Sequence, residues 1–244
     1  MAVLVSLLQL AVSLSVFPIH LLHFLGLWDW ICKRFFPYFM VRFTESYNKE
    51  MAAKKRELFG SLQQFAGPSG KLTLMEIGCG TGANFKFYPE GCRVTCIDPN
   101  PNFEKFLISS IAQSPHLHFD RFLVAPGEDL RHVEDSSMDT VVCTLVLCSV
   151  QNQDAFLKEV RRVLRPGGAF YFMEHVAAAP STWNFFWQQV LHPTWFVLFD
   201  GCHLTRESWK ALEQAGFSKL HLQHLQAPLS WKIVQPHILG YAIK

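Results

Sequence analysis

Charged side chains are missing from the start of the chain: no Asp, Glu, Lys or Arg occurs between Ala2 and Trp28. An apolar helix of about 20 residues can cross a bilayer core, so this stretch is long enough to do so. It lacks the basic leader and the small-residue cleavage site of a cleaved signal peptide. Pro18 and two histidines interrupt it, which leaves a kinked or re-entrant hairpin open beside a straight span. We expect residues 1–28 to form a hydrophobic membrane anchor.

Charge is also scarce in the chain as a whole, at 17% of residues with a net charge of +2. So small a basic excess disfavours a general nucleic-acid binder, and we expect no nucleic acid as a partner. Between Lys33 and Glu57, however, seven basic residues face three acids, beside a group of aromatic residues. Aromatic belts and positive charge mark the cytoplasmic side of a membrane anchor. We therefore expect residues 29–69 to be a basic juxtamembrane segment with an amphipathic helix at Glu45–Ala66, and the rest of the chain to face the cytoplasm.

Metal-ligand motifs are absent as well. None of the seven cysteines has a C-x-x-C partner, and the chain contains no H-E-x-x-H motif. This spacing indicates neither a zinc knuckle nor a redox pair, so we expect no metal. Several cysteines sit in apolar runs, which predicts reduced, buried thiols. Cys143 and Cys148 in particular are expected to be inert and not part of a covalent relay.

Strand and helix patterns alternate after residue 70, and we interpret residues 70–244 as one domain. Apolar strands are expected at Leu72–Ile77, Arg93–Ile97, Leu117–Val124, Thr140–Leu147, Ala169–Glu174, Ser218–His224 and His237–Ile243. Helices are expected at Ala83–Tyr88, Pro101–Gln113, Gln153–Leu164 and Thr205–Ala215. Continuous apolar strands between helices predict an α/β fold whose parallel sheet is covered on both faces.

The glycine-rich stretch "EIGCGTG" follows the first of these strands. Gly78, Gly80 and Gly82 alternate after Glu76, and no phosphate-loop lysine follows them. The pattern also differs from the G-x-G-x-x-G of dinucleotide sites, so it suits a ligand without a diphosphate. Asp98 closes the second strand, 16 residues past Gly82, where a carboxylate can accept hydrogen bonds from two ribose hydroxyls. A ligand with a ribose and no diphosphate is S-adenosylmethionine.

The chain resembles the class I S-adenosylmethionine-dependent methyltransferases in these and three further stretches: "GEDL" from Gly127, "SSMDTVVCTLVLCSV" from Ser136 and "RRVLRPGG" from Arg161. The resemblance implies a seven-stranded Rossmann-like sheet with helices on both faces. It also implies a donor site, with an adenine-contacting loop at "GEDL" and a turn under the methyl donor in the second stretch. The residues implied are Glu76, Gly78, Gly80, Gly82, Asp98, Gly127, Glu128, Asp129 and Leu145.

The apolar N-terminus together with "KKRELF", "GCGTGANFKFYP", "GCRVTCIDPNPNFEKFL" and "VVCTLVLCSVQNQ" is similar to a narrower group, the membrane-anchored methyltransferase-like thiol S-methyltransferases. That similarity implies methylation of small lipophilic alkyl thiols at the endoplasmic reticulum and lipid-droplet membrane, with the catalytic domain facing the cytoplasm. Two alternatives stay open: a lipid or quinone methyltransferase, and a non-catalytic membrane or lipid-droplet interaction protein.

On the acceptor side, Asp98 is the first candidate for a catalytic role, chiefly because it would hold the donor in line. His175 follows the fifth expected strand and is a candidate base or acceptor contact. A histidine merely hydrogen-bonded at a strand end is an equally good interpretation. Glu174, Asp200 and His203 are further candidate helpers.

An aromatic segment follows at Trp183–Phe199, with seven aromatic residues in "WNFFWQQVLHPTWFVLF". It could be an apolar lid over a lipophilic substrate, a surface that dips into a bilayer, or a packed helix. An acceptor that arrives from the membrane suits the first two interpretations.

Overall fold

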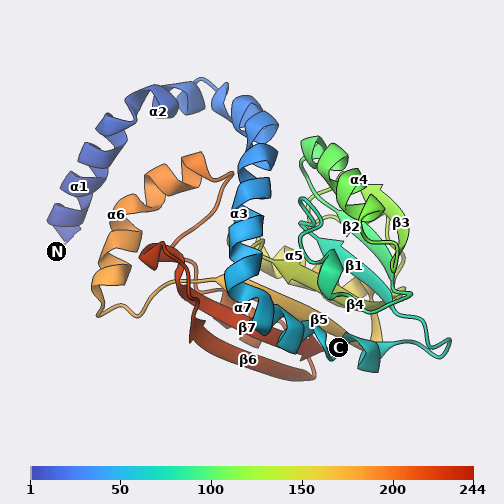
Figure 1. The fold of residues 1–244 in the computed structure, drawn as a ribbon. Coiled ribbons are helices and arrows are strands. Elements are labelled where there is room, and N and C mark those ends of the chain that lie inside the picture. The colour runs from blue at the N-terminus through green and yellow to red at the C-terminus, as the bar shows by residue number, and fades with distance from the viewer. Residues whose placement is uncertain (1) are drawn as a thin grey trace.

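The computed structural model describes residues 2–244, which build one seven-stranded sheet in the order β3-β2-β1-β4-β5-β7-β6 (Figure 1). Strands β1 to β5 are parallel, and β7 is antiparallel to both of its neighbours. The strands are β1 Thr73–Ile77, β2 Arg93–Ile97, β3 His118–Leu123, β4 Met138–Thr144, β5 Leu164–His175, β6 Lys219–Gln226 and β7 Pro236–Ile243. The expected α/β fold and its strands are thus confirmed.

Helices cover both faces of this sheet. They are α1 Ala2–Ser15, α2 Phe17–Phe24, α3 Trp28–Phe59, α4 Glu104–Ala112, α5 Gln153–Val163, α6 Trp183–Leu198 and α7 Ser208–Gln214. Short 3₁₀ helices are η1 Leu62–Phe65, η2 Phe85–Phe87, η3 Pro101–Phe103 and η4 Lys232–Val234.

Neighbouring residues along each central strand serve opposite faces, as the period of two requires. Leu74 of β1 packs in the core that α3 and α4 cover, with Met51 of α3. The next residue, Met75, packs in the core that α5 and α7 cover, with Phe156 of α5. Because both faces are buried, the carboxyl ends of the parallel strands are left as the place where the fold opens to a ligand.

Two expected helices differ from what the structure contains. The helix expected at Ala83–Tyr88 is wrong: the chain makes tight turns there, with only η2 at its centre. The buried side chain of Asn84 explains this, because it bonds to Glu76 and Lys55 and holds the chain in the turn. The amphipathic helix expected from Glu45 is part of α3 and begins much earlier, at Trp28.

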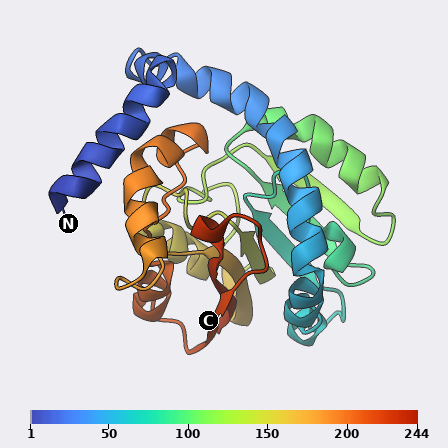
Figure 2. The ribbon, with the colours of Figure 1, turned by 60° about the vertical axis from the view of Figure 1, so that its left-hand side comes forward.

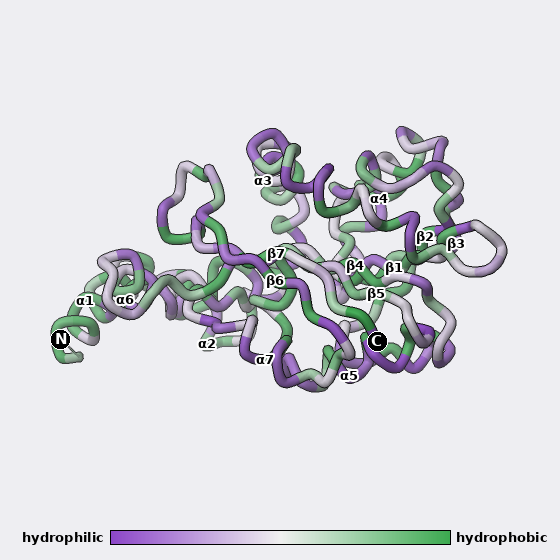
Figure 3. The backbone as a smooth tube through the Cα atoms, turned by 90° about the horizontal axis from the view of Figure 1, so that it is seen from below, coloured by the Kyte–Doolittle hydropathy of each residue, from purple (hydrophilic) through white to green (hydrophobic). Residues whose placement is uncertain are grey.

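The apolar N-terminal segment forms the first two helices. Within residues 2–244, no individual helix combines the length and the apolar character of a bilayer span. Taken together, α1 and α2 satisfy both measures, but they are bent by 87° at their junction. Figure 3 shows that α1 is hydrophobic along most of its length and lies with α6 to one side of the sheet.

The segment α1–α2, with the start of α3, forms an arc around α6 (Figures 1 and 2). The side chain of Gln9 donates a hydrogen bond to the carbonyl of Gln189 at 2.9 Å. Further along both segments, the indole of Trp28 donates to the carbonyl of Val197 at 2.7 Å. The N-terminal arc and α6 therefore run in the same direction and form one unit.

Candidate functional site

The glycine turn lies between the carboxyl end of β1 and η2. Its first two amides, Gly78 and Cys79, donate to the carbonyl of Ile97 at 2.8 and 3.1 Å. Gly78, Gly80 and Gly82 all have positive φ, a region that favours glycine. A Cβ on Gly78 would lie 2.2 Å from Cγ2 of Val146, so this position also requires a residue without a side chain.

Asp98 fixes the glycine turn from the end of β2. One carboxylate oxygen accepts the Gly80 amide proton and the other accepts the Asn100 amide proton, each at 2.9 Å. A carboxylate offers about four acceptor positions, so two remain for a vicinal diol. Burial raises the pKa of Asp98 to about 6. The backbone beside it is open, because a Cβ on Gly80 would meet nothing nearer than the Phe103 ring, at 3.7 Å. These residues fit a ribose laid against the turn.

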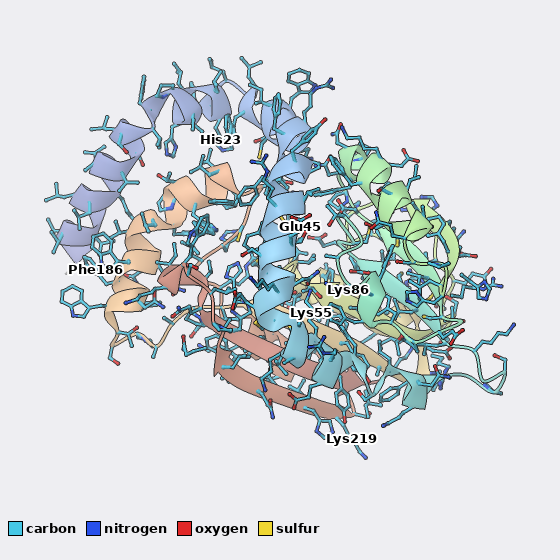
Figure 4. The ribbon with its side chains drawn as sticks, viewed as in Figure 1. His23, Glu45, Lys55, Lys86, Phe186 and Lys219 are labelled. Carbon is cyan, nitrogen blue, oxygen red and sulfur yellow. The ribbon has the colours of Figure 1, made fainter. Side chains whose placement is uncertain are left out.

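Glu76 lies behind the turn and not on a cavity wall. Its carboxylate accepts from the Asn84 amide at 2.8 Å and from the Tyr88 hydroxyl at 2.7 Å. Lys55 of α3, seen where α3 meets the sheet in Figure 4, donates to Asn48 and to Asn84. Burial raises the pKa of Glu76 to about 7 and lowers that of Lys55 to about 7. This buried network braces the turn, whereas the sequence predicted that Glu76 contacts the donor.

An outer cleft opens on one side of the turn. Gly78 forms part of its floor, and Pro99, Gly127 and Glu128 are among the residues on its walls. Glu128 accepts the backbone amide proton of Gln151 at 2.6 Å, which fixes the loop to the start of α5. Gly127 and Glu128 therefore line the same cleft as Gly78, and their contact with an adenine stays a prediction.

Asp129, the third predicted residue of that loop, has a different environment. Its carboxylate pairs with Arg131 at 2.6 Å at the surface, and neither residue lines the cleft or the cavity described next. The interaction with Arg131 lowers the pKa of Asp129. The structure thus separates Asp129 from its two neighbours in the loop.

An inner cavity adjoins the outer cleft, and both contact Gly78, Val146 and Asp200. Asp98 and Leu145 line the inner cavity beside the glycine turn. The rest of its wall is largely aromatic and comes from α3, η3, α6 and the segment before β7. These rings are Phe36, Phe39, Phe43, Tyr47, Phe103, Trp195, Phe199 and Trp231. An apolar chamber next to a polar turn is typical of a small-molecule site.

Two residues on the cavity wall have left-handed backbone conformations that are unusual outside glycine. Leu145 follows β4 with φ 59°, and Asp200 follows α6 with φ 48°. The amide of Leu145 donates to the carbonyl of Met173 at 3.0 Å, which holds the turn against β5. Strained backbone of this kind concentrates at functional sites.

His175 lies at the carboxyl end of β5 and faces the inner cavity with Cys148 and Cys202. Its Nε2 is 3.0 Å from Sγ of Cys202, which also accepts the indole proton of Trp195 at 3.2 Å. The amide of His203 donates to the carbonyl of Cys148 at 2.9 Å, which ties the loop after α6 to the turn after β4. The ligand atoms of His175, Cys148 and Cys202 all lie within 4.8 Å of one another. We call these three residues the Cys–His cluster.

The Cys–His cluster is buried, and burial contributes to the pKa shifts of Cys148, His175 and the adjacent Glu174. The hydrogen bond to Cys202 and burial raise the pKa of Cys148 well above its ordinary value. Burial lowers the pKa of His175, but Cys148 and Glu174 outweigh it, so the net shift is upward. Glu174 lies behind the turn after β4, accepts the Val146 amide proton at 3.1 Å, and has a pKa raised by burial.

A tyrosine–histidine pair beside the Cys–His cluster, where His237 of β7 pairs with His175 of β5, was not predicted from the sequence. Nδ1 of His237 is 3.1 Å from the carbonyl of Gln235, and Nε2 is 3.1 Å from the Tyr47 hydroxyl. Because a carbonyl only accepts, Nδ1 carries the proton and Nε2 accepts from Tyr47. Burial lowers the pKa of His237 to about 3, so the ring is neutral. The helical spacing of Phe36, Phe43 and Tyr47 was the available signal for this part of the cavity wall.

The aromatic segment at Trp183–Phe199 forms α6 and the residue that follows it. At its carboxyl end, Trp195 and Phe199 line the inner cavity, as a lid would. At its amino end, Trp183 is 79% exposed, and Phe186 lies beside α1 (Figure 4). His203, also predicted as a helper, lines the outer cleft, and burial lowers its pKa to about 4.

Comparison with known proteins gives consistent results. Residues 75–172 match the family model described as a methyltransferase domain. The chain is 71% identical over 240 residues to the thiol S-methyltransferase TMT1A of Homo sapiens, covering 98% of both chains. It is 57% identical to the thiol S-methyltransferase TMT1B of Homo sapiens over the full length of both.

Among solved structures, the CurJ carbon methyltransferase superposes with a TM-score of 0.62 at 18% sequence identity. The match covers 84% of this chain and 58% of that one. At this identity the likeness concerns the fold alone.

Proposed function

Because the chain belongs to the family of thiol S-methyltransferases, we propose that it transfers the methyl group of S-adenosylmethionine to the sulfur of small lipophilic alkyl thiols. One arrangement carries this proposal: Asp98 holds the glycine turn, and the apolar cavity beside it ends on His175 and Cys202. A donor with a ribose fits the first part, and an apolar acceptor with a small reactive head fits the second.

Each part of the site has a task in an in-line displacement. S-adenosylmethionine, when bound, supplies a methyl group already activated on a sulfonium. Asp98 and the backbone of Gly78 and Gly80 fix the ribose and the adjoining chain, and Gly127 and Glu128 lie beside the adenine. The aromatic wall excludes water and aligns the acceptor, and alignment can remove a large part of the barrier to such a step.

The acceptor must lose a proton, because the thiolate is the reactive form of a thiol. An unperturbed thiol with a pKa near 8.5 is only a few per cent ionised at neutral pH. His175 lines the inner cavity with Nε2 toward Cys202, and we propose that its imidazole contacts the acceptor's head group there. We assign His175 as the acceptor contact and base, and Asp98 as the residue that positions the donor.

The membrane is the proposed source of the acceptor. Val3, Leu7, Leu10 and Leu14 recur at helical spacing on α1 and are all more than half exposed. Opposite this face, α1 packs on α6, whose other end lines the cavity. The exposed face of α1 would lie in the interfacial layer, and a lipophilic thiol dissolved there would have a short path to the cavity.

If the bent pair α1–α2 lies within one leaflet, it suits a lipid droplet, because the droplet surface is a lipid monolayer that a helix cannot cross from one aqueous side to another. It suits the endoplasmic reticulum membrane equally well. We propose both as locations, with the methyltransferase domain on the cytoplasmic side, where the basic residues of α3 would meet anionic headgroups.

The test of the activity uses the full chain purified in detergent, labelled S-adenosylmethionine, and a panel of alkyl thiols, phenols, amines and quinols. Products are identified by mass. The proposal predicts alkyl methyl thioethers as the main products, and turnover that rises with acceptor chain length. Asp98→Ala should abolish donor binding and turnover and leave the membrane association unchanged.

Methylated quinols or phenols as the main products would instead support a lipid or quinone methyltransferase. No product from any acceptor, with donor binding intact, would contradict catalysis of this kind. If Asp98→Ala methylates as well as the parent protein, the ribose has been placed wrongly.

A further inference from the structure

The three ligand atoms of the Cys–His cluster converge within 4.8 Å, which a histidine base and two inert thiols would not require. We propose that Cys148, His175 and Cys202 bind a soft divalent cation such as Zn²⁺, and that the acceptor thiol is its fourth ligand. His175 is then a metal ligand, and the ion acidifies the thiol in place of the base assigned above. This inference rests on the proposed function, since it explains how the same site would select sulfur over oxygen or nitrogen. Spacing along the chain contains no metal motif, and folding alone brings the three residues together.

The separations fit a tetrahedral ion. With metal–sulfur and metal–nitrogen distances of about 2.3 and 2.0 Å, tetrahedral ligand atoms lie about 3.5–3.8 Å apart. In the cluster, Nε2 of His175 and Sγ of Cys202 are 3.0 Å apart, and all three ligand atoms lie within 4.8 Å of one another. Movements of a few tenths of an ångström to about one ångström would therefore accommodate the ion.

The donor set selects the kind of metal. Two thiolates and an imidazole are soft to intermediate ligands, which favour zinc over calcium or magnesium. Three protein ligands with an open fourth position are typical of a catalytic zinc site, and four protein ligands of a structural one. Among residues 2–244, the cluster contains no fourth His, Cys, Asp or Glu. All three members line the inner cavity, so the open position faces the acceptor.

The surroundings of Cys202 also suit a metal-bound thiolate. The indole N–H of Trp195 donates to its sulfur, and a sulfur that accepts a hydrogen bond carries negative charge more readily. Trp195 itself is part of the cavity wall, which keeps the ligand in a dry environment. A hydrogen bond that orients a ligand is a regular feature of metal sites.

Charge and protons balance in the resulting step. The ion and two cysteine thiolates have no net charge, and the acceptor thiol binds as thiolate while its proton leaves to solvent. The resulting anionic centre lies beside the positive sulfonium. The acceptor sulfur forms a bond to the methyl carbon as the bond from carbon to the sulfonium sulfur breaks, and the leaving sulfur keeps the electron pair. The neutral thioether is a weak ligand and departs, and the ion keeps its oxidation state.

Cobalt titration of the full-length protein tests the metal site. Chelator-treated protein in detergent is titrated with Co²⁺, whose thiolate charge-transfer absorption reports bound sulfur. We expect saturation at one equivalent and displacement by Zn²⁺. Cys148→Ser, Cys202→Ser and His175→Gln should each weaken cobalt binding at least about tenfold. Cys92→Ser is the matched control. Cys92 is also buried, but it precedes the amino end of β2, whereas the site lies at the carboxyl ends of the parallel strands, so this variant should bind cobalt as the parent does.

The acceptor's role has its own measurement. A short alkyl thiol should shift the cobalt spectrum, and the alcohol of the same chain length should not. Three results would overturn the inference: folded protein that binds donor but no Co²⁺, binding that survives all three substitutions, or a spectrum that does not change with thiol. If metal-free protein methylates alkyl thiols as fast as the zinc-loaded form, the inference fails while the proposed function stands.

Discussion

At the residue scale, both tasks of Asp98 need the ionised carboxylate, whereas its burial favours the protonated form. Ionised, it accepts the Gly80 and Asn100 amide protons and keeps acceptor positions for a diol. Burial raises its pKa from 3.8 to about 6, so protonation comes close to physiological pH. We expect donor affinity to be constant above pH 7 and to fall about tenfold per unit well below pH 6, as measured by calorimetry.

The stability of the protein changes with the opposite sign. A raised carboxyl pKa means that the folded state binds its proton more tightly than the unfolded state. The contribution of Asp98 to stability is therefore present at low pH and lost as the pH rises through about 6. Weak donor binding at pH 5 is thus not explained by unfolding at this residue. A donor affinity that stays flat from pH 8 to pH 5 would contradict the assignment.

Glu76 provides a second prediction, because the structure gives it a bracing role. Glu76→Gln keeps an acceptor for Asn84 and should change the free energy of unfolding by less than about 1 kcal/mol, with donor affinity unchanged. Glu76→Ala leaves Asn84 and Tyr88 without their acceptor and should cost about 2–4 kcal/mol in urea unfolding. If the stable Gln variant loses donor affinity, Glu76 contacts the donor after all.

The sequence could place Glu76, Asp98 and His175 at strand ends, but not the direction in which each side chain points. Glu76 faces Asn84 and Tyr88 because the turns after Gly82 bring these two side chains back to it, and Lys55 of α3 holds Asn84 in place. The Cys–His cluster was unpredictable for a similar reason. Its members come from the turn after β4, the last residue of β5 and the loop after α6, three segments that only tertiary packing brings together.

At the element scale, the glycine turn depends on an absent side chain at Gly78. Gly78→Ala would need positive φ and would also press its Cβ against Val146 at 2.2 Å. Gly91→Ala carries the same kind of φ penalty, about 1–2 kcal/mol, but meets no atom within 4 Å. We expect Gly78→Ala to lower donor affinity at least about tenfold and Gly91→Ala to preserve it. Equal donor affinities in the two variants would contradict a close fit at this turn.

The exposed face of α1 leads to a prediction about membrane binding. Leu10 of α1 and Ile108 of α4 are equally exposed, at 57% and 59%. Leu10→Glu should reduce co-flotation with phospholipid vesicles at least about tenfold, because a charge enters the interface and an apolar side chain leaves it. Ile108→Glu adds the same charge to the methyltransferase domain and should have no effect. Equal loss in both variants would show that general charge, and not this face, controls binding.

The elements themselves were largely predictable, since β1, β2, β4 and the second half of β5 are mostly apolar runs separated by turn residues. Two features of the helices could not be predicted from the sequence. The α3 helix begins at Trp28 and continues through Glu45, where the amphipathic helix was expected to begin, because its packing against η3 and α6 is tertiary and nothing in the local sequence marks it. The stretch after Gly82 reads as helical, but buried hydrogen bonds of Asn84 override its local propensity.

At the scale of the whole molecule, α3 connects the N-terminal arc to the glycine turn. Phe39 and Phe43 of α3 line the inner cavity, while Phe35 and Tyr38 of the same helix are exposed. Because α6 packs on the N-terminal arc and also lines the inner cavity, our proposal has the lipophilic acceptor enter along α6 and the water-soluble donor enter by the outer cleft. This arrangement depends on contacts between residues more than 160 positions apart, which local sequence patterns do not reveal.

Isothermal titration calorimetry with S-adenosylmethionine and with S-adenosylhomocysteine tests the central claim most directly. The account predicts that the full-length protein binds either ligand at one site, and that Asp98→Ala gives no heat with either while its circular dichroism spectrum matches that of the parent. Absence of heat from the folded parent protein, or an Asp98→Ala variant that binds as tightly as the parent, would contradict the account.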